Sequence, residues 1–537
     1  MTSWGTRVIA LSTALEHALG QGAADEGLRQ LLRGIEKESL RVDGDSRLAS
    51  TPHPVCLGSP LTHPSITTDF SEAQLELITG VSPSAADTLA QLQSTHRFVV
   101  HCLGEERLWA SSMPGRLPED SAIPVGRYGT SNVGMAKTVY RRGLGLRYGR
   151  TMQTISGIHY NFSLSEALWQ WLGEQEGEGA PSQAYRTRRY FDLIRNFRRH
   201  SWLLLYLFGA SPAVFEGFLQ GRTHQLEKRG KDTLLLPHAT TLRMGGLGYQ
   251  SDAQATLKVS YNGLAPYAQT LQGALTRPYG PYEAFGLEQN GEFVQLSTSL
   301  LQIENEFYGT IRPKRSIRPG ERALHALGER GVEYVEVRCL DLNPFLPLGI
   351  DAPTIHFLDT FLLLCLLLPS PEDSPAEIDQ LAQMHRAVVE RGRDPALRLT
   401  TAAGEGSLAA LGAPLLAAAA PIAEALDRSQ GTTAHRDALA RAAQALSDPD
   451  CTPSAAVLAE MRREGDSFLA LTQALSDQHR ETLQSLPLST EEEAAQAAVA
   501  KESHAAQATI EAQDRESFAA YRKAYMEQPL LPPHGTA

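Results

Sequence analysis

Two carboxylates stand two residues apart in the run GIEKESLRV, whose alternating pattern predicts a β-strand. On a strand, Glu36 and Glu38 point to the same face, roughly 6–7 Å apart. Like charges at that spacing repel each other unless a cation lies between or beside them. Oxygen-rich clusters of this kind suit Mg²⁺ or Mn²⁺. Taken alone, however, the pair is more simply explained as a solvated strand face.

A second acidic group lies in the run TTDFSEAQLELITG. Asp69 lies at the end of one extended stretch. Glu76 stands inside the next one, flanked by Leu75 and Leu77. An acidic residue inside an apolar strand is costly unless it is paired or bound to a metal. Glu76 is therefore a candidate ligand, whereas Glu72 is expected to be a surface residue.

A histidine follows in the predicted strand GIHYNFSL, where His159 shares a face with Gly157 and Asn161. A lone histidine on a strand is usually a hydrogen-bonded structural residue. It becomes a metal ligand only where carboxylates converge on it.

The run VEYVEVRCLDLNPF puts Glu336 and Arg338 side by side on one strand face. One interpretation is a buried ion pair. The other is a metal carboxylate beside a guanidinium, the pair that neutralises a transferring phosphoryl group.

The run LQIENEFYGTIRPKR is predicted as another strand, with Gln302, Glu304, Glu306 and Tyr308 on one face. A basic cluster follows, formed by Arg312, Lys314 and Arg315. This cluster either holds nucleotide phosphates or is a solvated turn.

Several common signatures are missing from the sequence. It contains neither GxxxxGK[ST] nor GxGxxG, so any ATP must be held by metals and a sheet rather than by a phosphate-binding loop. It contains no GxSxG motif, and its five cysteines form no CxxC pair. Covalent catalysis, a disulfide framework and a zinc knuckle therefore have no support, and we expect reduced thiols.

Strand-like runs alternate with helical stretches without a regular βαβ order, which predicts an α+β fold with a mainly antiparallel sheet. Residues 1–33 are predicted to be a helical lead-in, and residues 182–208 are predicted to be helical. Beyond about residue 370 the chain is rich in Ala, Leu, Glu and Gln. We therefore expect a catalytic domain over 1–370 and a helical layer or subdomain over 371–537. Pro414 and Pro421 are expected to break one of its helices.

The 537 residues carry a formal net charge of −12, which argues against general nucleic-acid binding. Residues 371–537 hold 14 basic and 25 acidic residues, so the excess lies almost entirely in the C-terminal third. The arginine-rich run 185–199 is read as a helix with a basic outer face. The most apolar run, residues 361–368, is too short for a bilayer, which needs roughly 20 residues. We expect a cytoplasmic protein that binds no membrane and no nucleic acid.

Seven runs together resemble the proteobacterial class of the glutamate–cysteine ligase family: GIEKESLRV, TTDFSEAQLELIT, YGTSNVGMAKTVYRRGL, YGRTMQTISGIHYNFS, YLFGASPAV, LQIENEFYGTIRPKR and GVEYVEVRCLDLNPF. They follow one another in order, and the resemblance extends from about residue 30 to about residue 400. It implies a glutamine-synthetase-like curved antiparallel sheet that holds ATP and Mg²⁺ or Mn²⁺. In that family ATP phosphorylates the γ-carboxylate of glutamate, and the amine of cysteine then attacks the acyl phosphate.

The same resemblance assigns roles to matching positions. It implies six metal ligands: Glu36, Glu38, Asp69, Glu76, His159 and Glu336. Arg338 would stabilise the phosphoryl group, and Arg141 and Arg243 would anchor substrate carboxylates. The cysteine pocket would comprise Tyr140, Gln153, Tyr249 and Tyr308. Lys314 is expected to contact phosphate, mostly because of its charge.

Glutamate, cysteine and ATP are the expected partners, with feedback inhibition by glutathione, and we expect a monomer. Two alternatives stay open: a related ligase with another amine acceptor, and a catalytically silent binding module. The silent module is disfavoured because the whole set of expected site residues is intact: Glu36, Glu38, Asp69, Glu76, His159, Glu336 and Arg338. The run RMGGLGY is more glycine-rich than the family pattern, which bears on the stiffness of that loop.

Overall fold

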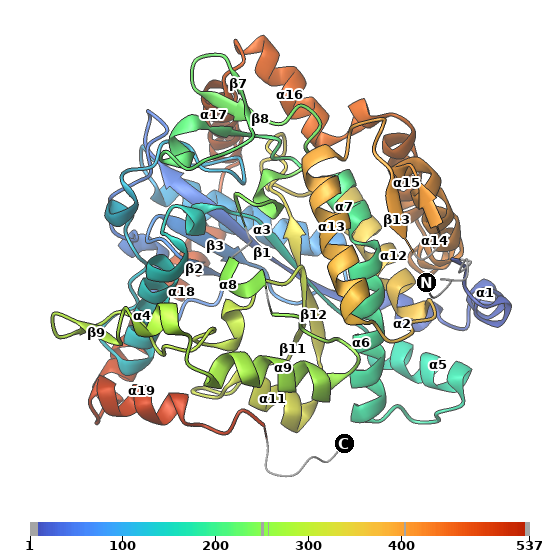
Figure 1. The fold of residues 1–537 in the computed structure, drawn as a ribbon, viewed down its shortest axis with the longest axis horizontal. Helices are drawn as coiled ribbons and strands as arrows, with labels where there is room; N and C mark the ends of the chain where they lie inside the picture. Colours follow the sequence, from blue (N-terminus) through green and yellow to red (C-terminus); the bar gives the residue numbers. More distant parts are fainter. Residues whose placement is uncertain (1–8, 249–251, 256, 402–403, 532–537) are drawn as a thin grey trace.

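The computed structural model describes residues 9–248, 252–255, 257–401 and 404–531. Its centre is a seven-stranded antiparallel sheet with the order β11-β12-β5-β1-β3-β2, in which β4 also pairs with β1 (Figure 1). The strands are β1 (Leu32–Val42), β2 (Ile66–Thr68), β3 (Gln74–Ile78), β4 (Arg107–Leu108), β5 (Ile158–Ser163), β11 (Ile311–Lys314) and β12 (Tyr334–Leu340). The predicted α+β class with an antiparallel sheet is confirmed.

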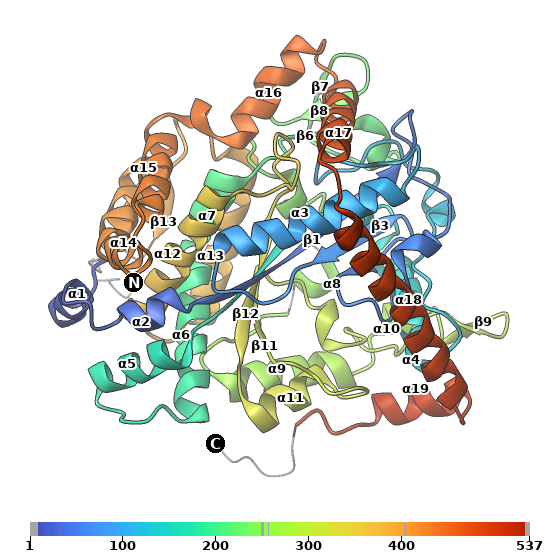
Figure 2. The same cartoon turned by 180° about the vertical axis from the view of Figure 1, so that it is seen from behind.

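Apolar side chains from one face of this sheet pack into the main core. Ile35 of β1, Ile158 of β5 and Val337 of β12 are all buried there. Helices α3 (Ala85–Cys102), α6 (Gln183–His200), α7 (Trp202–Phe208) and α12 (Ala352–Leu367) cover this face and contact the strands or one another. Figure 2 shows α3 lying across β1. We call this side the back face. Because side chains alternate along a strand, the neighbouring residues point to the opposite, front face.

Helix α12 contains the apolar run 361–368 up to Leu367, and nearly all of its side chains are buried. The prediction of a core helix is therefore confirmed. The prediction of helix over 182–208 is also confirmed, by α6 and α7. The helical lead-in predicted over residues 1–33 contains α1 (Thr13–Gly20) and α2 (Asp25–Arg29), but it ends before β1 begins at Leu32, and its residues 1–8 lie outside the described residues. Helix α6 differs in one respect, since Arg195 on its supposed outer face is buried and paired with Asp192.

The front face is bordered by α4 (Asn132–Tyr148), the 3₁₀ turn η3 (Met152–Thr154) and the segment around η6 (Glu304–Glu306). Smaller elements complete this part of the chain: α5 (Glu166–Glu176), β6 (Ala213–Phe215), β7 (Glu227–Arg229), β8 (Thr233–Leu235), α8 (Asp252–Ala255), α9 (Leu264–Thr276), α10 (Gly280–Glu283), β9 (Glu288–Gln289), β10 (Glu292–Phe293) and α11 (Ala323–Arg330).

The C-terminal third is helical apart from the hairpin β13 (Leu399–Thr401) and β14 (Gly404–Gly406). Its helices are α13 (Pro375–Arg391), α14 (Leu408–Gln430), α15 (Ala434–Ser447), α16 (Pro453–Arg463), α17 (Phe468–Ser485), α18 (Thr490–Gln513) and α19 (Phe518–Met526). They pack around the sheet domain: α14 contacts α2, α17 contacts α3, and α19 contacts α4. The division of the chain at residue 370 stays a prediction.

Helix α14 corrects one expectation, because it runs unbroken through Pro414 and Pro421. Its buried side chains, among them Leu415 and Ile422, pack into the core beside α12 and α15. Tertiary packing of this kind outweighs the local loss of two hydrogen bonds. Within the described residues, α14 is also the one helix long and apolar enough to cross a bilayer. Only 44% of its most apolar window is buried, and a core helix passes the same test.

Two further expectations were wrong. Residues 302–308 are not a strand, because η6 interrupts them and β11 begins only at Ile311. The reason is that Glu306 turns inward to Arg147, 2.8 Å away. Glu72 is buried rather than exposed, and its carboxylate accepts hydrogen bonds from the backbone N–H groups of His53 and Arg127.

Candidate active site

Three neighbouring strands bring four of the predicted metal ligands together on the front face. In the β-sheet register Glu36 of β1 lies opposite His159 of β5. His159 Nδ1 is 3.1 Å from Glu36 Oε2 and 3.5 Å from Glu336 Oε1. His159 Nε2 is 3.4 Å from Glu38 Oε1. The carboxylates therefore converge on His159, which is the condition that the prediction of a metal ligand set for this residue.

The next strand adds a second acidic group beside Glu38. Glu76 of β3 lies directly opposite Glu38, and β2 leads to Asp69 on the other side of Glu76. Burial and repulsion by Asp69 raise the pKa of Glu38 to about 8. Burial and the charges of Glu36 and Asp69 raise the pKa of Glu76 well above its usual value. This side of the acidic cluster thus holds more negative charge than its protein neighbours neutralise.

Cations balance the other side of the cluster, at Glu336. Arg338 Nη1 lies 2.6 Å from Glu336 Oε1, and Lys314 Nζ lies 3.0 Å from Glu336 Oε2. Burial opposes the charge of Glu336, but Lys314 and Arg338 outweigh it and hold the pKa of this carboxyl well below its usual value. Burial also opposes the charge of Glu36, yet its hydrogen bond with His159 lowers the pKa to about 2.

Arg243 is completely buried beneath the same face. Its Nη2 donates to the backbone oxygen of Arg338 at 2.9 Å, and its Nη1 is 4.0 Å from Asp341 Oδ1. A Cβ atom at Gly157 would lie 2.1 Å from Arg243 Nη2, so only glycine leaves room for this guanidinium. Sequence reasoning missed Asp341, whose carboxylate is fixed by the hydroxyls of Ser211 and Thr241. The acidic residue in the run CLDL was its only signal.

Arg141 lies on α4 and contacts the segment that carries Asp69. Its guanidinium stacks on Tyr128, 4.5 Å from the ring centroid, and its Nε donates to the backbone oxygen of Asp69. A further hydrogen bond of 3.4 Å reaches the backbone oxygen of Thr68. The preceding residue, Tyr140, is half-buried, and its main-chain oxygen accepts from Gln302.

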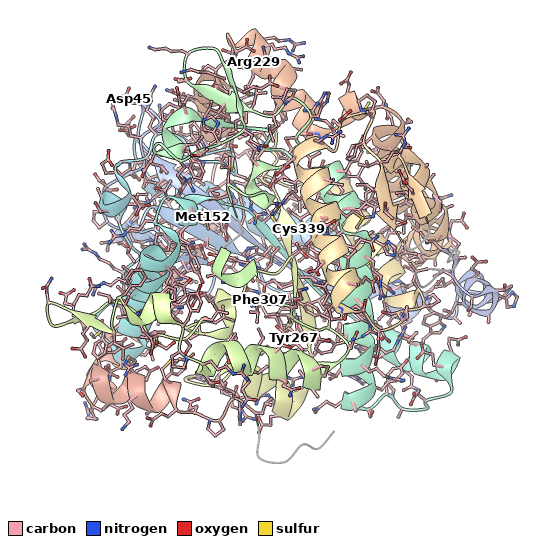
Figure 3. All side chains as sticks on the ribbon, viewed as in Figure 1. Asp45, Met152, Arg229, Tyr267, Phe307 and Cys339 are labelled. Carbon is pink, nitrogen blue, oxygen red and sulfur yellow. The ribbon has the colours of Figure 1, made fainter. Side chains whose placement is uncertain are left out.

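Tyr308 and Gln153 meet at the other border of the front face. Gln153 Nε2 donates to Tyr308 Oη at 2.9 Å. In Figure 3 the labelled Met152 and Phe307 mark the two segments that supply them, and Cys339 marks β12. The predicted Tyr249 lies outside the described residues.

A set of side chains that the sequence did not suggest supports Tyr308. Tyr148 packs edge-on against its ring and donates to Glu306. Gln254 donates to Tyr148 Oη and accepts from the backbone N–H of Tyr308. The sequence could not identify this network, because its members come from three distant segments, around Tyr148, Gln254 and Glu306–Tyr308.

The donor set of the acidic cluster fits a divalent cation. It offers carboxylate oxygens and one imidazole nitrogen. Glu38 Oε1 and His159 Nε2 are buried and make no hydrogen bond, although they face each other at 3.4 Å. Buried polar atoms without hydrogen-bond partners are rare in folded proteins and are commonly explained by a missing ion or water.

The curved antiparallel sheet with this acidic face is that of an ATP-dependent ligase with a glutamine-synthetase-like fold. The chain belongs to the glutamate–cysteine ligase family, whose model matches residues 17–388.

Proteins named glutamate–cysteine ligase are similar to this chain over nearly its whole length. A glutamate–cysteine ligase of Pseudomonas putida (strain W619) is 50% identical over 498 residues, covering 93% of this chain and 95% of the relative. One from Pseudomonas aeruginosa (strain LESB58) is 50% identical over 507 residues, covering 94% and 96%. The crystal structure of glutamate–cysteine ligase from Francisella tularensis in complex with AMP has a TM-score of 0.87 and 34% identity, and covers 93% of this chain and 98% of that one. A bifunctional glutathione synthetase from Pasteurella multocida has a TM-score of 0.68 and 26% identity, over 87% of this chain and 55% of that one.

Proposed function

We propose that this protein joins the γ-carboxylate of L-glutamate to the amine of L-cysteine, with ATP converted to ADP and phosphate. The product is γ-glutamylcysteine, formed through γ-glutamyl phosphate in the first step of glutathione biosynthesis. The observation that carries the proposal is the front face itself, where carboxylates converge on His159 and cations converge on Glu336. The relatives named above act in this reaction by name.

The acidic cluster suits the first half of the reaction. ATP and glutamate are both anions, so they approach each other only where positive charge offsets their repulsion. Glu36, Glu38, Asp69, Glu76, His159 and Glu336 would hold Mg²⁺ or Mn²⁺. The ions would neutralise the phosphate oxygens when bound. The AMP bound to the Francisella tularensis relative supports a nucleotide site on this fold.

Arg338 is the group best placed to meet the transferred phosphoryl group. It lies on the front face, its side chain is 15% exposed, and Glu336 fixes its orientation at 2.6 Å. A guanidinium held in advance stabilises charge that develops during transfer without needing to reorganise. Lys314 is the second cation at Glu336 and would contact a phosphate oxygen from the edge of the sheet.

The acyl phosphate then needs the amine of cysteine close to its carbonyl carbon. Arg141 and Arg243 would anchor substrate carboxylates, which positions the reacting groups and lowers the entropic barrier. Tyr140, Gln153, Tyr249 and Tyr308 would form the cysteine pocket. The hydrogen bond from Gln153 to Tyr308 fixes one wall of this pocket. A ligase that uses another amine acceptor is not favoured, because the relatives are named as ligases of glutamate and cysteine.

Purified protein with Mg²⁺, ATP and glutamate tests the proposal through ADP release with and without cysteine. We expect cysteine-dependent release of ADP and accumulation of γ-glutamylcysteine. Release that does not depend on cysteine, or that depends on another amine, would contradict it. Added glutathione should lower the rate of ADP release, as feedback inhibition predicts. A cytoplasmic monomer is the expected state, which sedimentation and cell fractionation would check.

A further inference from the structure

A second group of metal-ligating side chains lies behind the catalytic sheet. It consists of His356, Asp359 and His435, and one ligand atom from each lies within 4.8 Å of the other two. Asp359 accepts a hydrogen bond of 2.6 Å from the hydroxyl of Tyr160, which points to the back face because its neighbour His159 points to the front. The group is therefore separate from the acidic cluster.

Two helices position this trio. His356 and Asp359 are three residues apart on α12, so they lie on the same side of that helix. His435 lies in the first turn of α15, which packs against α12. The rings of the two histidines are 4.6 Å apart between centroids and inclined at 63°. The sequence places His435 far from the other two, and the contact between α12 and α15 brings it to them.

Asp427 fixes the orientation of His435. Its carboxylate accepts hydrogen bonds from the backbone N–H groups of His435 and Arg436, and it lies 3.0 Å from His435 Nδ1. Nδ1 therefore carries the proton, and Nε2 has a free lone pair. A carboxylate behind a histidine in this way is the arrangement that orients metal-bound imidazoles.

One ring nitrogen of each histidine in the trio lacks a hydrogen-bond partner among the described residues. His435 Nε2 and His356 Nδ1 are buried and make no hydrogen bond among the described residues. His435 as a whole is 0% exposed. Burial lowers the pKa of both histidines, which keeps their imidazoles neutral and able to bind a metal. Two buried nitrogens without partners are costly unless something occupies the space between them.

Asp359 completes the set without losing its other contacts. Its Oδ1 accepts from Tyr160 and from Arg33 Nε, and its Oδ2 lies 2.9 Å from Arg33 Nη2. A carboxylate has about four lone-pair directions. One direction on Oδ2 is therefore left for a further ligand.

We propose that His356, Asp359 and His435 form a binding site for a divalent transition-metal ion of the Zn²⁺ class. Two neutral imidazoles and one carboxylate are a donor set typical of such ions, with bond lengths of about 2.0–2.2 Å. Mg²⁺ prefers oxygen ligands, so the chemistry separates this site from the acidic cluster on the front face. The bound ion would join the start of α15 to α12.

Zinc binding is the direct test, and it requires that the acidic cluster does not interfere. The probe is Zn²⁺ titrated by calorimetry into the metal-free protein in excess Mg²⁺, using His159→Gln as the background. We expect one equivalent of Zn²⁺ to bind and the melting temperature to rise by a few degrees. In the same background, His435→Gln and His356→Gln should each lower the affinity at least about tenfold. His101→Gln, on the exposed end of α3, is the matched control and should bind Zn²⁺ normally.

A second measurement does not depend on the variants folding. Crystals of the unmodified protein soaked in Zn²⁺ should show an anomalous peak at the zinc absorption edge between α12 and α15. Tetrahedral d–d bands should also appear when Co²⁺ is added to the unmodified protein in excess Mg²⁺. The proposal is overturned if the His159→Gln protein binds no Zn²⁺, or if anomalous peaks occur only on the front face or the surface.

Discussion

The two faces of the catalytic sheet both contain buried charges, but they stabilise them in different ways. On the front face, β1 contributes Glu36 and Glu38 to a cluster of like charges in which Glu38 Oε1 has no hydrogen bond. On the back face, Arg33 of the same strand forms a one-to-one ion pair with Asp359. Lys37, between the two glutamates in sequence, also points backwards and meets the neutral ring of His96.

This difference distinguishes buried charges that bind ligands, on the front face, from buried charges that stabilise the fold, on the back face. A cluster of buried carboxylates destabilises the folded protein until cations bind to it. Such a cluster is therefore expected only where ligands bind. The Arg33–Asp359 pair behind the sheet is neutralised within the protein, so it does not depend on the substrates or cations of the front face. Changes on the front should therefore alter rate with little effect on stability, and changes on the back should do the opposite.

The largest expected effect is on the front face. Arg338→Ala should lower kcat by about 10³-fold or more, because it removes the guanidinium nearest the transferred phosphoryl group. The melting temperature should change little, since Arg338 is partly exposed. Cysteine-dependent ADP release measures the rate.

Arg315→Ala is the matched control. This arginine lies beyond the end of β11 and pairs with Glu333 at 3.6 Å instead of with the acidic cluster. It should retain most of the activity. Equal losses in the two variants would show that general positive charge, rather than the placement of Arg338, matters.

The next effect is on the back face. Arg33→Met leaves the Asp359 carboxylate buried without its cation, and both side chains are at most 2% exposed. Breaking a buried pair on one side costs about 3–5 kcal/mol of unfolding free energy. Urea unfolding measures this loss. The double variant Arg33→Met/Asp359→Leu should recover much of it. If Arg33→Met lost activity but kept its stability, Arg33 would act in catalysis like the front-face residues, which would contradict the prediction.

How much of this contrast the sequence could predict depends on the period of a strand. Alternation alone places Glu36 with Glu38, and Glu336 with Arg338, on common faces. It cannot show which strands are neighbours, and only the register that sets Glu36 opposite His159 turns a lone histidine into part of a cluster. The position of Tyr249 in the cysteine pocket stays a prediction.

The errors arose where distant segments decide the local structure. Glu306 is buried because Arg147 of α4 reaches it, so the run around it forms η6 instead of a strand. Glu72 is buried because two backbone N–H groups from other loops donate to it. Neither partner is visible from the residues nearby, and the same holds for Asp341 beneath Arg243.

A smaller effect should follow from crowding the support of Arg243. In Gly157→Ala the new methyl group would lie 2.1 Å from Arg243 Nη2 and displace the guanidinium. A displacement of about 1 Å can lower kcat/KM by up to 10²-fold, and we expect a loss of about 10–100-fold. Steady-state kinetics for glutamate and cysteine measure it. Gly246→Ala, for which no heavy atom of the described residues lies within 4 Å of the added Cβ, is the control. Unchanged kinetics for both would exclude a role for the position of Arg243.

The smallest effect concerns Lys37 and the dependence of stability on pH. Burial lowers the pKa of Lys37 to about 7 from its ordinary 10.5, which it keeps in the unfolded chain. Between these two values the unfolded chain binds the proton and the folded protein does not. The free energy of unfolding therefore rises with pH across this window, and the gain is absent below it, where both states are protonated.

Lys37→Met isolates this contribution. Between about pH 6 and pH 8 the unmodified protein should gain about 1.4 kcal/mol more unfolding free energy than the variant. The reason is that about one pH unit of this interval lies above the folded pKa, and each unit in which only the unfolded chain holds the proton corresponds to that amount. Urea unfolding of the two proteins at both pH values measures the difference. Turnover at neutral pH should stay within about threefold, since the Lys37 amine faces His96 behind the sheet. The opposite result would be a variant that loses its turnover but whose stability depends on pH as in the unmodified protein. In that case the Lys37 amine would contribute to catalysis from the back face. The division between the two faces of β1 would then be wrong.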